Sequence, residues 1–280
     1  MNAKDTGTRT HGPWLVDSTL REGEQAPGVV FALRDKLELA SRLADLGIPE
    51  LEVGTPAMGS AAESDIAALL GLGLPIRLTA WCRARRDDLE AAARCGVTAV
   101  HVSLPASPLL RRTMGKSEDW VIDSMIEALA DARRLFDFVS VGLKDASRAS
   151  LPFLERCAAV ARESGAGRLR LADTVGIWNP LRTHEIFSAL RRRAEELPLG
   201  FHGHNDLGMA VGNSLSAFSA GANTLDVTVG GLGERSGNAP LEQVVMALEL
   251  SEGITTGVDA SGLYDLSRIA ARASGRTVPP

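Results

Sequence analysis

The stretch from residue 14 to residue 25 is WLVDSTLREGEQ, an apolar run followed at once by a dense group of charged and polar side chains. The run Trp14-Leu15-Val16 predicts a buried strand. Burying unpaired charges is costly, so a strand that ends in this way must deliver them to a place where they are paired or used. A solvated loop behind an N-terminal strand would have the same pattern, and this stretch alone does not separate the two interpretations.

A second stretch far along the chain, His202-Gly203-His204-Asn205-Asp206, also follows an apolar run. Residues two apart on a strand point to the same side, so His202 and His204 can bind one metal ion. A single histidine more often fills a satisfied core position. A pair at a strand end, combined with the acids of residues 17–25, favours a site of two histidines and one carboxylate, for which Glu22 is the predicted carboxylate.

Composition places the chain among ordinary globular enzymes. It has 280 residues, of which 45% are hydrophobic and 23% charged, and a net charge of −5 without a basic stripe. We therefore expect one or two domains and no nucleic-acid partner. No run of 18 apolar residues predicts a membrane span, and the polar N-terminus lacks the apolar run of a secretory signal. Three cysteines at unrelated spacings are typical of reduced thiols, so we expect a soluble cytoplasmic protein.

Apolar runs and helical periodicities alternate strictly along the chain, which predicts a parallel sheet. Eight such units at this length favour a closed (β/α)8 barrel, the TIM barrel, with a short extra helix at the C-terminus. A doubly wound sheet is less consistent, because no G-x-G-x-x-G follows the first strand. After the opening strand, we expect strands at 50–54, 75–81, 97–104, 138–143, 168–172, 199–202 and 224–229, and helices at 34–47, 60–72, 87–95, 117–135, 150–164, 180–196, 208–220, 240–250 and 261–273.

The domain boundaries follow from the same pattern. We expect a flexible N-terminus at residues 1–12, a catalytic barrel at 13–255, and a C-terminal helix and tail at 256–280. In such barrels the reactive residues lie at the C-terminal ends of the strands and in the loops that follow. All eight predicted strands end in polar residues or are followed by them, whereas we expect few at the opposite ends. The set comprises Asp17, Arg21, Glu22, Glu52, Arg83, His101, Ser103, Lys144, Asp145, Arg148, Asp173, Thr174, His202, His204 and the glycine-rich loop 230–238.

Several of these residues suggest roles around a metal. Asn238 is a candidate oxygen ligand from the glycine-rich loop, and Asn205 and Asp206 could hold the imidazoles by hydrogen bonds. Without thiolates in a ligand pattern, nitrogen and oxygen ligands suit Mn, Mg, Co or Zn. The loop holds four glycines, more than an ordinary turn needs, which would let the backbone approach a ligand closely.

Of the other polar residues near this site, Arg21 and His101 have two interpretations each. Arg21 could form a salt bridge with Asp17, or could hold negative charge that develops on a substrate oxygen. Arg148 and Thr174 are donors suited to a carboxylate. His101 is as consistent with a core histidine as with a functional one. A metal that polarises a carbonyl, with cations around it, fits the making or breaking of a carbon–carbon bond through an enolate.

These motifs resemble those of the DRE-TIM metallolyases, from about Leu15 to Pro280. The loop in the form Gly-Glu-Arg-x-Gly-Asn-Ala is similar to that of the Claisen-condensing synthases (2-isopropylmalate, homocitrate and citramalate synthases), and lyases of the superfamily carry a cysteine there that is absent here. Other segments resemble most the nitrogen-fixation type of homocitrate synthase. The matching segments are 17–23, 78–83, 145–148, 172–176, 202–206 and 231–239.

The resemblance implies a metal-dependent acyltransferase that condenses acetyl-CoA, the enolate donor, with a 2-oxo acid, of which 2-oxoglutarate is favoured. A divalent metal would hold the keto and carboxylate oxygens of the oxo acid. Arg21 would stabilise the oxyanion, with Asp17 orienting it. The resemblance implies metal ligation by Glu22, His202 and His204 with Asn238 near or on the metal, and substrate contacts from Thr174, from Arg83 or Arg148 at a distal carboxylate, and from Glu52 and Gln25.

Synthases of this family continue past the barrel into a segment whose His and Tyr, often from the partner subunit, help to deprotonate acetyl-CoA. This sequence ends at Pro280, near where that segment would begin, and its one tyrosine, Tyr264, matches no catalytic motif. We expect a homodimer, with three alternatives. A second subunit could supply the missing segment. A barrel residue such as His101 could act as the base for a different acyl-CoA reaction or for an aldol or retro-aldol reaction. Alternatively, the barrel could bind a metal and a 2-oxo acid, for regulation or assembly, without turnover. A hydroxy-acyl lyase is a further alternative.

Overall fold

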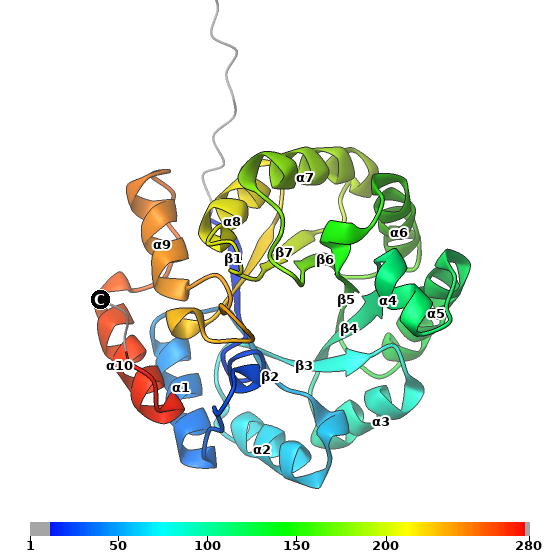
Figure 1. The fold of residues 1–280 in the computed structure, drawn as a ribbon. Coiled ribbons are helices and arrows are strands. Elements are labelled where there is room, and N and C mark those ends of the chain that lie inside the picture. The colour runs from blue at the N-terminus through cyan, green and yellow to red at the C-terminus, as the bar shows by residue number, and fades with distance from the viewer. Residues whose placement is uncertain (1–11, 278–280) are drawn as a thin grey trace, which may run out of the picture.

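The computed structural model describes residues 12–277 and shows a closed barrel of eight parallel strands, β1 to β8 in sequence order, surrounded by helices (Figure 1). The predicted (β/α)8 fold is therefore confirmed. The strands are β1 (Trp14–Asp17), β2 (Glu50–Gly54), β3 (Arg77–Arg83), β4 (Ala99–Pro105), β5 (Phe138–Lys144), β6 (Arg168–Asp173), β7 (Leu199–Gly203) and β8 (Thr224–Val227).

The longer helices cover the outside of the barrel because they carry an apolar face. In α6, for example, the buried residues recur at spacings of one, three and four, which places them on one side of the helix; they are Phe153, Leu154, Cys157, Ala158 and Ala161. The helices are α1 (Leu33–Asp45), α2 (Ser60–Leu70), α3 (Arg86–Cys95), α4 (Pro108–Thr113), α5 (Glu118–Ala132), α6 (Leu151–Glu163), α7 (Pro180–Ala194), α8 (Ala210–Ser219), α9 (Leu241–Leu250) and α10 (Leu263–Ser274).

Two local predictions need correction. Trp14 does not lie in the core: its side chain is 40% exposed, and its indole Nε1 donates to Glu50 Oε2 at 2.8 Å. The segment before α5 contains a short helix, α4, where the sequence predicts a loop. Ser107 caps it by accepting from the Leu110 N–H at 3.2 Å, and Pro108 follows at the first helical position, where its missing N–H costs nothing.

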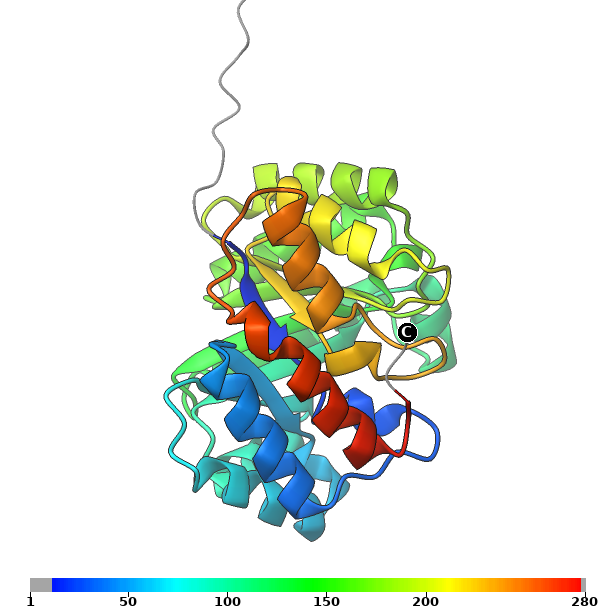
Figure 2. The same cartoon turned by 90° about the vertical axis from the view of Figure 1, so that its left-hand side faces the viewer.

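The extra C-terminal helix, α10, packs beside α1 and crosses the outside of the barrel between α1 and α9 (Figure 2). Gly262, just before it, allows the close approach: a Cβ there would lie 2.3 Å from Leu46 Cδ2. The predicted flexible segment 1–12 falls outside the described residues except for Gly12. No helix within residues 12–277 is both long and apolar enough to cross a membrane.

The expectation of few polar groups at the N-terminal ends of the strands is wrong, because a buried ionic network fills that half of the barrel, which we call the lower half. Glu50 on β2 binds both Nη atoms of Arg168 on β6, at 2.7 and 3.1 Å, and Arg77 on β3 adds a bond of 3.2 Å. Thr79 donates to Glu50 Oε1 at 2.8 Å, and Arg168 Nε donates to Ser140 at 3.2 Å. Side chains alternate along a strand, so charged residues at every second position of β2 and β6 point to the same side, the interior of the barrel.

Candidate active site at the C-terminal face of the barrel

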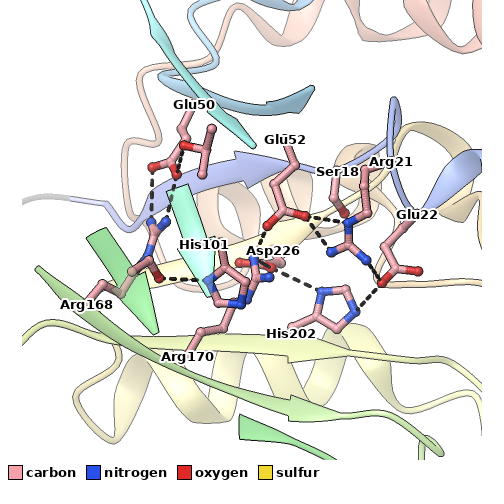
Figure 3. Close-up of polar contacts among 12 residues, drawn as sticks. Ser18, Arg21, Glu22, Glu50, Glu52, His101, Arg168, Arg170, His202 and Asp226 are labelled. Carbon is pink, nitrogen blue, oxygen red and sulfur yellow. Dashed lines mark hydrogen bonds and ion pairs between the residues drawn. The ribbon is translucent and has the colours of Figure 1, made fainter. Parts of the chain in front are cut away.

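Three predicted metal ligands come together at the C-terminal mouth of the barrel (Figure 3 shows two of them). Glu22 follows β1, while His202 and His204 lie on β7 and directly after it. Their ligand atoms all fall within 4.8 Å of one another. His202 Nε2 is 3.3 Å from His204 Nε2 and 3.6 Å from Glu22 Oε1, and the three residues are 3–6% exposed. The arrangement is a buried cluster of two histidines and one carboxylate.

The charge states of this cluster suit a divalent cation. Burial alone would raise the pKa of Glu22, but the charges of Arg21 and the two imidazoles outweigh it and lower the pKa to about 2. Burial, and next the neighbouring His202, lower the pKa of His204 to about 3. At neutral pH Glu22 is therefore ionised and His204 neutral, which are the forms that metal ligation requires.

Asn238 adds an oxygen beside the cluster. It pairs with His204 through an isolated antiparallel bridge, and its Nδ2 donates to the Leu232 carbonyl at 2.8 Å. Its Oδ1 and Glu22 Oε2 are both buried, and neither has a hydrogen-bond partner among residues 12–277. Gly233 makes room for the amide, since a Cβ there would lie 2.1 Å from Asn238 Nδ2. Buried acceptors almost always have partners, so these two free oxygens fit a metal at this cluster.

Arg21 lies next to the cluster. The sequence led us to expect that Asp17 holds it, but in the structure other carboxylates do. Its Nε and Nη2 donate to Glu52 Oε2 at 2.8 and 2.5 Å, and its Nη1 binds Glu22. Glu52 is fully buried on β2. Because the desolvated charge of Glu52 is bound by Arg21 and Arg170, its role in the structure is to fix cations rather than to face a substrate.

Asp17 instead anchors the loop that carries Asn238. Its carboxylate accepts from the Thr19 N–H at 2.9 Å and from the Thr19 hydroxyl at 3.0 Å. The Thr19 hydroxyl oxygen in turn accepts from the Val229 N–H at 2.8 Å, at the start of η4 (Val229–Gly231). Burial raises the pKa of Asp17 to about 7. The first strand thus positions the last loop of the barrel.

The residue that holds His202 was not predicted. Asp226 on β8 lies with its Oδ2 3.1 Å from His202 Nδ1, so the other ring nitrogen faces Glu22 (Figure 3). The prediction that Asn205 and Asp206 hold the imidazoles is wrong. Asp206 pairs with Arg235 at 2.6 Å, and Asn205 Oδ1 accepts from the Ala210 N–H.

Arg170 on β6 joins the two halves of this network. Its Nη1 donates to Glu52 Oε1 at 2.6 Å and to Asp226 Oδ2 at 2.5 Å. One guanidinium therefore links the carboxylate that holds Arg21 to the carboxylate that holds His202. The sequence carries a signal for this set in the alternating patterns Glu-Leu-Glu on β2 and Arg-Leu-Arg on β6, whose charged residues share one face of each strand.

A cavity of about 180 Å³ opens above the network. Of the residues to which the sequence assigned a role at the site, seven line it: Arg21, Glu22, Gln25, His101, Thr174, His202 and His204. Ser103, Lys144 and Glu234, which belong to the set of polar residues expected at the strand ends, line it as well. The other lining residues include Thr55, Trp81, Gly142, Leu143, Arg170 and Ala172. We call this space the chamber. Asp17, Glu52, Arg83, Arg148 and Asn238 do not line it. Glu52 nevertheless binds two residues that do, Arg21 and Arg170, and Asn238 pairs with a third, His204.

The two arginines expected at a distal carboxylate are engaged elsewhere. Arg83 binds both oxygens of Asp88 at 2.9 Å. Arg148 binds both oxygens of Asp145, with contacts of 2.6–2.9 Å. Thr174, in contrast, faces the chamber, and its hydroxyl accepts from the Asp145 N–H at 2.8 Å. Its hydroxyl hydrogen is then free to donate to a ligand.

His101 lies deep in the chamber on β4. Its Nδ1 is 2.9 Å from the Ser140 hydroxyl, and Gly142 leaves room for its ring, because a Cβ there would lie 2.3 Å from Nε2. Burial, and next the charge of Arg170, hold the pKa of His101 well below 6.5. The imidazole is therefore neutral at physiological pH.

Comparison with known proteins agrees with this geometry. The sequence model of the family described as HMGL-like matches residues 13–270. The chain belongs to the HMGL-like family. Within it, 2-isopropylmalate synthase 2 of Caldanaerobacter subterraneus subsp. tengcongensis is 43% identical over 268 residues, which are 95% of this chain and 70% of that protein. Homocitrate synthase 1 of Nostoc sp. is 42% identical, over 94% of this chain and 70% of its own length.

Two further similarities bear on architecture. Homocitrate synthase subunit alpha of Clostridium pasteurianum is 38% identical, and the match covers 87% of this chain and 91% of that subunit. Among solved structures, the HMG-CoA lyase of Bacillus subtilis superposes with a TM-score of 0.85, covering 98% of this chain and 97% of the lyase. At 22% identity, that likeness shows the shared fold alone.

Proposed function

We propose that this chain is a metal-dependent acyltransferase that condenses acetyl-CoA with a 2-oxo acid, with 2-oxoglutarate as the favoured acceptor. The observation that carries the proposal is the cluster of Glu22, His202 and His204 within 4.8 Å at the mouth of the barrel. Its support is the synthase names of relatives 42–43% identical to this chain. The cysteine that lyases of the superfamily carry in the last loop is absent, which favours the synthase over the lyase.

The proposed chemistry divides the work among residues of the chamber. A divalent metal (Mn, Mg, Zn or Co) held by Glu22, His202 and His204, with Asn238 beside it, would polarise the keto group of the oxo acid. Arg21 would stabilise the oxyanion that develops as the new carbon–carbon bond forms. Because two carboxylates fix its guanidinium, Arg21 is held in place before substrate arrives. Thr174 would donate its hydroxyl hydrogen to the substrate carboxylate.

Deprotonation of acetyl-CoA needs a base, and His101 is our candidate within the chamber. Its neutral imidazole can accept a proton, but a base works best when its pKa lies near the working pH. The pKa of His101 lies well below that range. We therefore expect slow turnover where His101 alone takes the proton, and faster turnover where a second chain supplies a better base.

The match to a subunit named alpha favours one alternative, a barrel that works with a separate partner. The experiment that separates the two is thiol release from acetyl-CoA by the purified, Mn-loaded chain with a panel of 2-oxo acids. We expect release with one oxo acid, abolished by His202→Ala and unchanged by His184→Ala, which removes an exposed histidine on α7. Tight, Mn-dependent binding of an oxo acid without thiol release would contradict the stand-alone enzyme and support the two-chain alternative.

A further inference from the structure

Within the described residues, 12–277, the chamber contains one positive charge that pairs with no carboxylate. Among the described residues that line it, the cationic side chains are Arg21, Lys144 and Arg170. Arg21 binds Glu22 and Glu52, and Arg170 binds Glu52 and Asp226. Lys144 forms no ion pair or side-chain hydrogen bond with any residue from 12 to 277. The carboxylate next to it in the sequence, Asp145, is already bound by Arg148.

The strand that carries Lys144 directs it into the chamber. On β5, the hydroxyl of Ser140 points into the barrel, where it contacts His101 and Arg168. Side chains alternate along a strand, so residues 142 and 144 face the same interior. Residue 142 is a glycine, and the His101 ring occupies the space where a side chain of residue 142 would lie.

Lys144 lies across the barrel from Glu22, whereas His202 and His204 lie on β7 and directly after it, two strands from β5. In a closed barrel with strands in the order β1 to β8, β5 is four strands away from β1 in either direction (Figure 1). Glu22 follows β1, whereas Lys144 ends β5, and both line the same chamber of about 180 Å³. A small acid bound by one end at the cluster can therefore reach Lys144 with its other end inside the same chamber.

We propose that Lys144 binds a second carboxylate, at the far end of the oxo acid, and so selects 2-oxo dicarboxylic acids. This inference rests on the proposed function and names the residue that sets its substrate class. The Lys144 side chain is exposed to solvent where it lines the chamber. An unpaired ammonium there favours an anionic group over an apolar tail, which offers the charge no partner. Lys144 takes the place that the sequence suggested for Arg83 or Arg148, both of which are neutralised by aspartates.

The test compares two ligands that differ in the distal group alone. 2-Oxoglutarate and 2-oxovalerate have the same five-carbon chain, and only the first ends in a carboxylate. Calorimetric titration of the Mn-loaded protein gives a dissociation constant for each, and their ratio measures the preference. We expect a preference for 2-oxoglutarate of about fivefold, the upper range for a partly exposed ion pair, and a smaller one at high salt.

Variants assign that preference to one side chain. Lys144→Met should bring the ratio close to one by weakening 2-oxoglutarate binding while leaving 2-oxovalerate unchanged. Lys144→Arg should keep most of the preference. The matched control is Lys116→Met, which removes the same charge where it lies over the Trp120 ring, outside the chamber, and should keep the full preference.

The outcomes separate this inference from the proposed function. If both acids bind in a Mn-dependent way but Lys144→Met leaves the ratio unchanged, the role of Lys144 is overturned and the proposed function stands. If the unmodified chain prefers 2-oxovalerate, the role of Lys144 and the choice of 2-oxoglutarate as acceptor are both overturned, while condensation with a 2-oxo acid stands. If neither acid binds with Mn present, both proposals fall.

Discussion

The interior of the barrel contains two buried ionic clusters, one toward each end, and they differ in how completely their polar atoms are paired (Figure 3). The lower cluster comprises Glu50, Arg77, Thr79, Ser140 and Arg168, and none of its side-chain atoms is buried without a hydrogen-bond partner. The upper cluster comprises Arg21, Glu22, Glu52, Arg170, His202 and Asp226. It leaves Glu22 Oε2 and Asp226 Oδ1 buried without one.

That difference separates a structural device from a reactive one. A fully paired buried network fixes the positions of its members, whereas an unpaired buried acceptor is costly unless a ligand uses it. Both clusters use charged residues that alternate along β2 and β6. Glu50 and Arg168 belong to the lower cluster, and Glu52 and Arg170, two residues further along each strand, belong to the upper one. In barrels of this kind the N-terminal face supports stability and the C-terminal face supports chemistry. Variants in the two clusters should therefore have separable effects.

The largest expected effect is on stability, from Arg168→Met in the lower cluster. The substitution leaves Glu50 buried with only its bonds to Trp14, Arg77 and Thr79. Removing one partner of a buried ion pair typically costs about 3–5 kcal/mol. We expect a loss of that size in the free energy of unfolding, measured by urea denaturation without metal, and an unchanged affinity for Mn.

The double variant Glu50→Gln/Arg168→Met is the matched control, because it also removes the charge of Glu50, which the single variant leaves without its Arg168 partner. It should recover part of the lost stability, since a buried pair replaced as a whole costs less than a pair that is broken. A loss of less than about 1 kcal/mol in the single variant, the usual size for an exposed pair, would contradict the lower cluster's role in stability. An equal loss of Mn affinity would contradict the separation of the two clusters.

The upper cluster shows where sequence reasoning reached its limit. Alternation of apolar runs and helical periods predicts the barrel, and the spacing of His202 and His204 predicts that they converge with Glu22. Partners across strands are harder to predict, because they depend on register. Asp226 lies on β8, next to β7 in the closed sheet, and nothing in the sequence around His202 points to it. Asn205 and Asp206 were nearer in sequence, but they follow the strand and turn toward other partners.

The second effect is a pH-dependent stability that resides in Asp17. Burial raises its pKa from 3.8 to about 7, so the folded state holds this proton more tightly than the unfolded chain does. The stabilisation is complete below about pH 4 and is lost as pH rises through 7. A shift from 3.8 to about 7 corresponds to about 4 kcal/mol, since one unit is worth about 1.36 kcal/mol.

In Asp17→Asn the side chain at position 17 cannot titrate. The free energy of unfolding of this variant, relative to that of the unmodified chain, should therefore increase between pH 4 and pH 8. Urea denaturation across that range, in the presence of EDTA, measures the difference. Its pH dependence matters rather than its absolute value, because asparagine also changes the bond to Thr19. Asp265→Asn, at an exposed position on α10, is the control. A difference for Asp17→Asn that does not vary with pH would show that Asp17 is ionised throughout.

The smallest effect tests which acid holds His202, and it opposes the structure directly to the sequence. Asp226 accepts from His202 Nδ1, whereas the sequence favoured Asp206, which in the structure binds Arg235. Groups that orient a metal-bound histidine typically contribute about 10–100-fold to metal affinity. We expect Asp226→Asn to weaken Mn binding by about that factor, measured by calorimetry, and Asp206→Asn to leave it nearly unchanged.

Each result carries a distinct meaning because the two variants make the same chemical change close to the same histidines. Asparagine at 226 offers His202 a neutral acceptor and leaves Arg170 paired with Glu52, so the fold should survive while the imidazole is held less firmly. A larger loss with Asp206→Asn would mean that the loop after β7, not β8, orients the ligands when metal is bound. Equal, small effects would mean that the barrel backbone alone fixes His202. Asp226 would then contribute nothing measurable to metal binding.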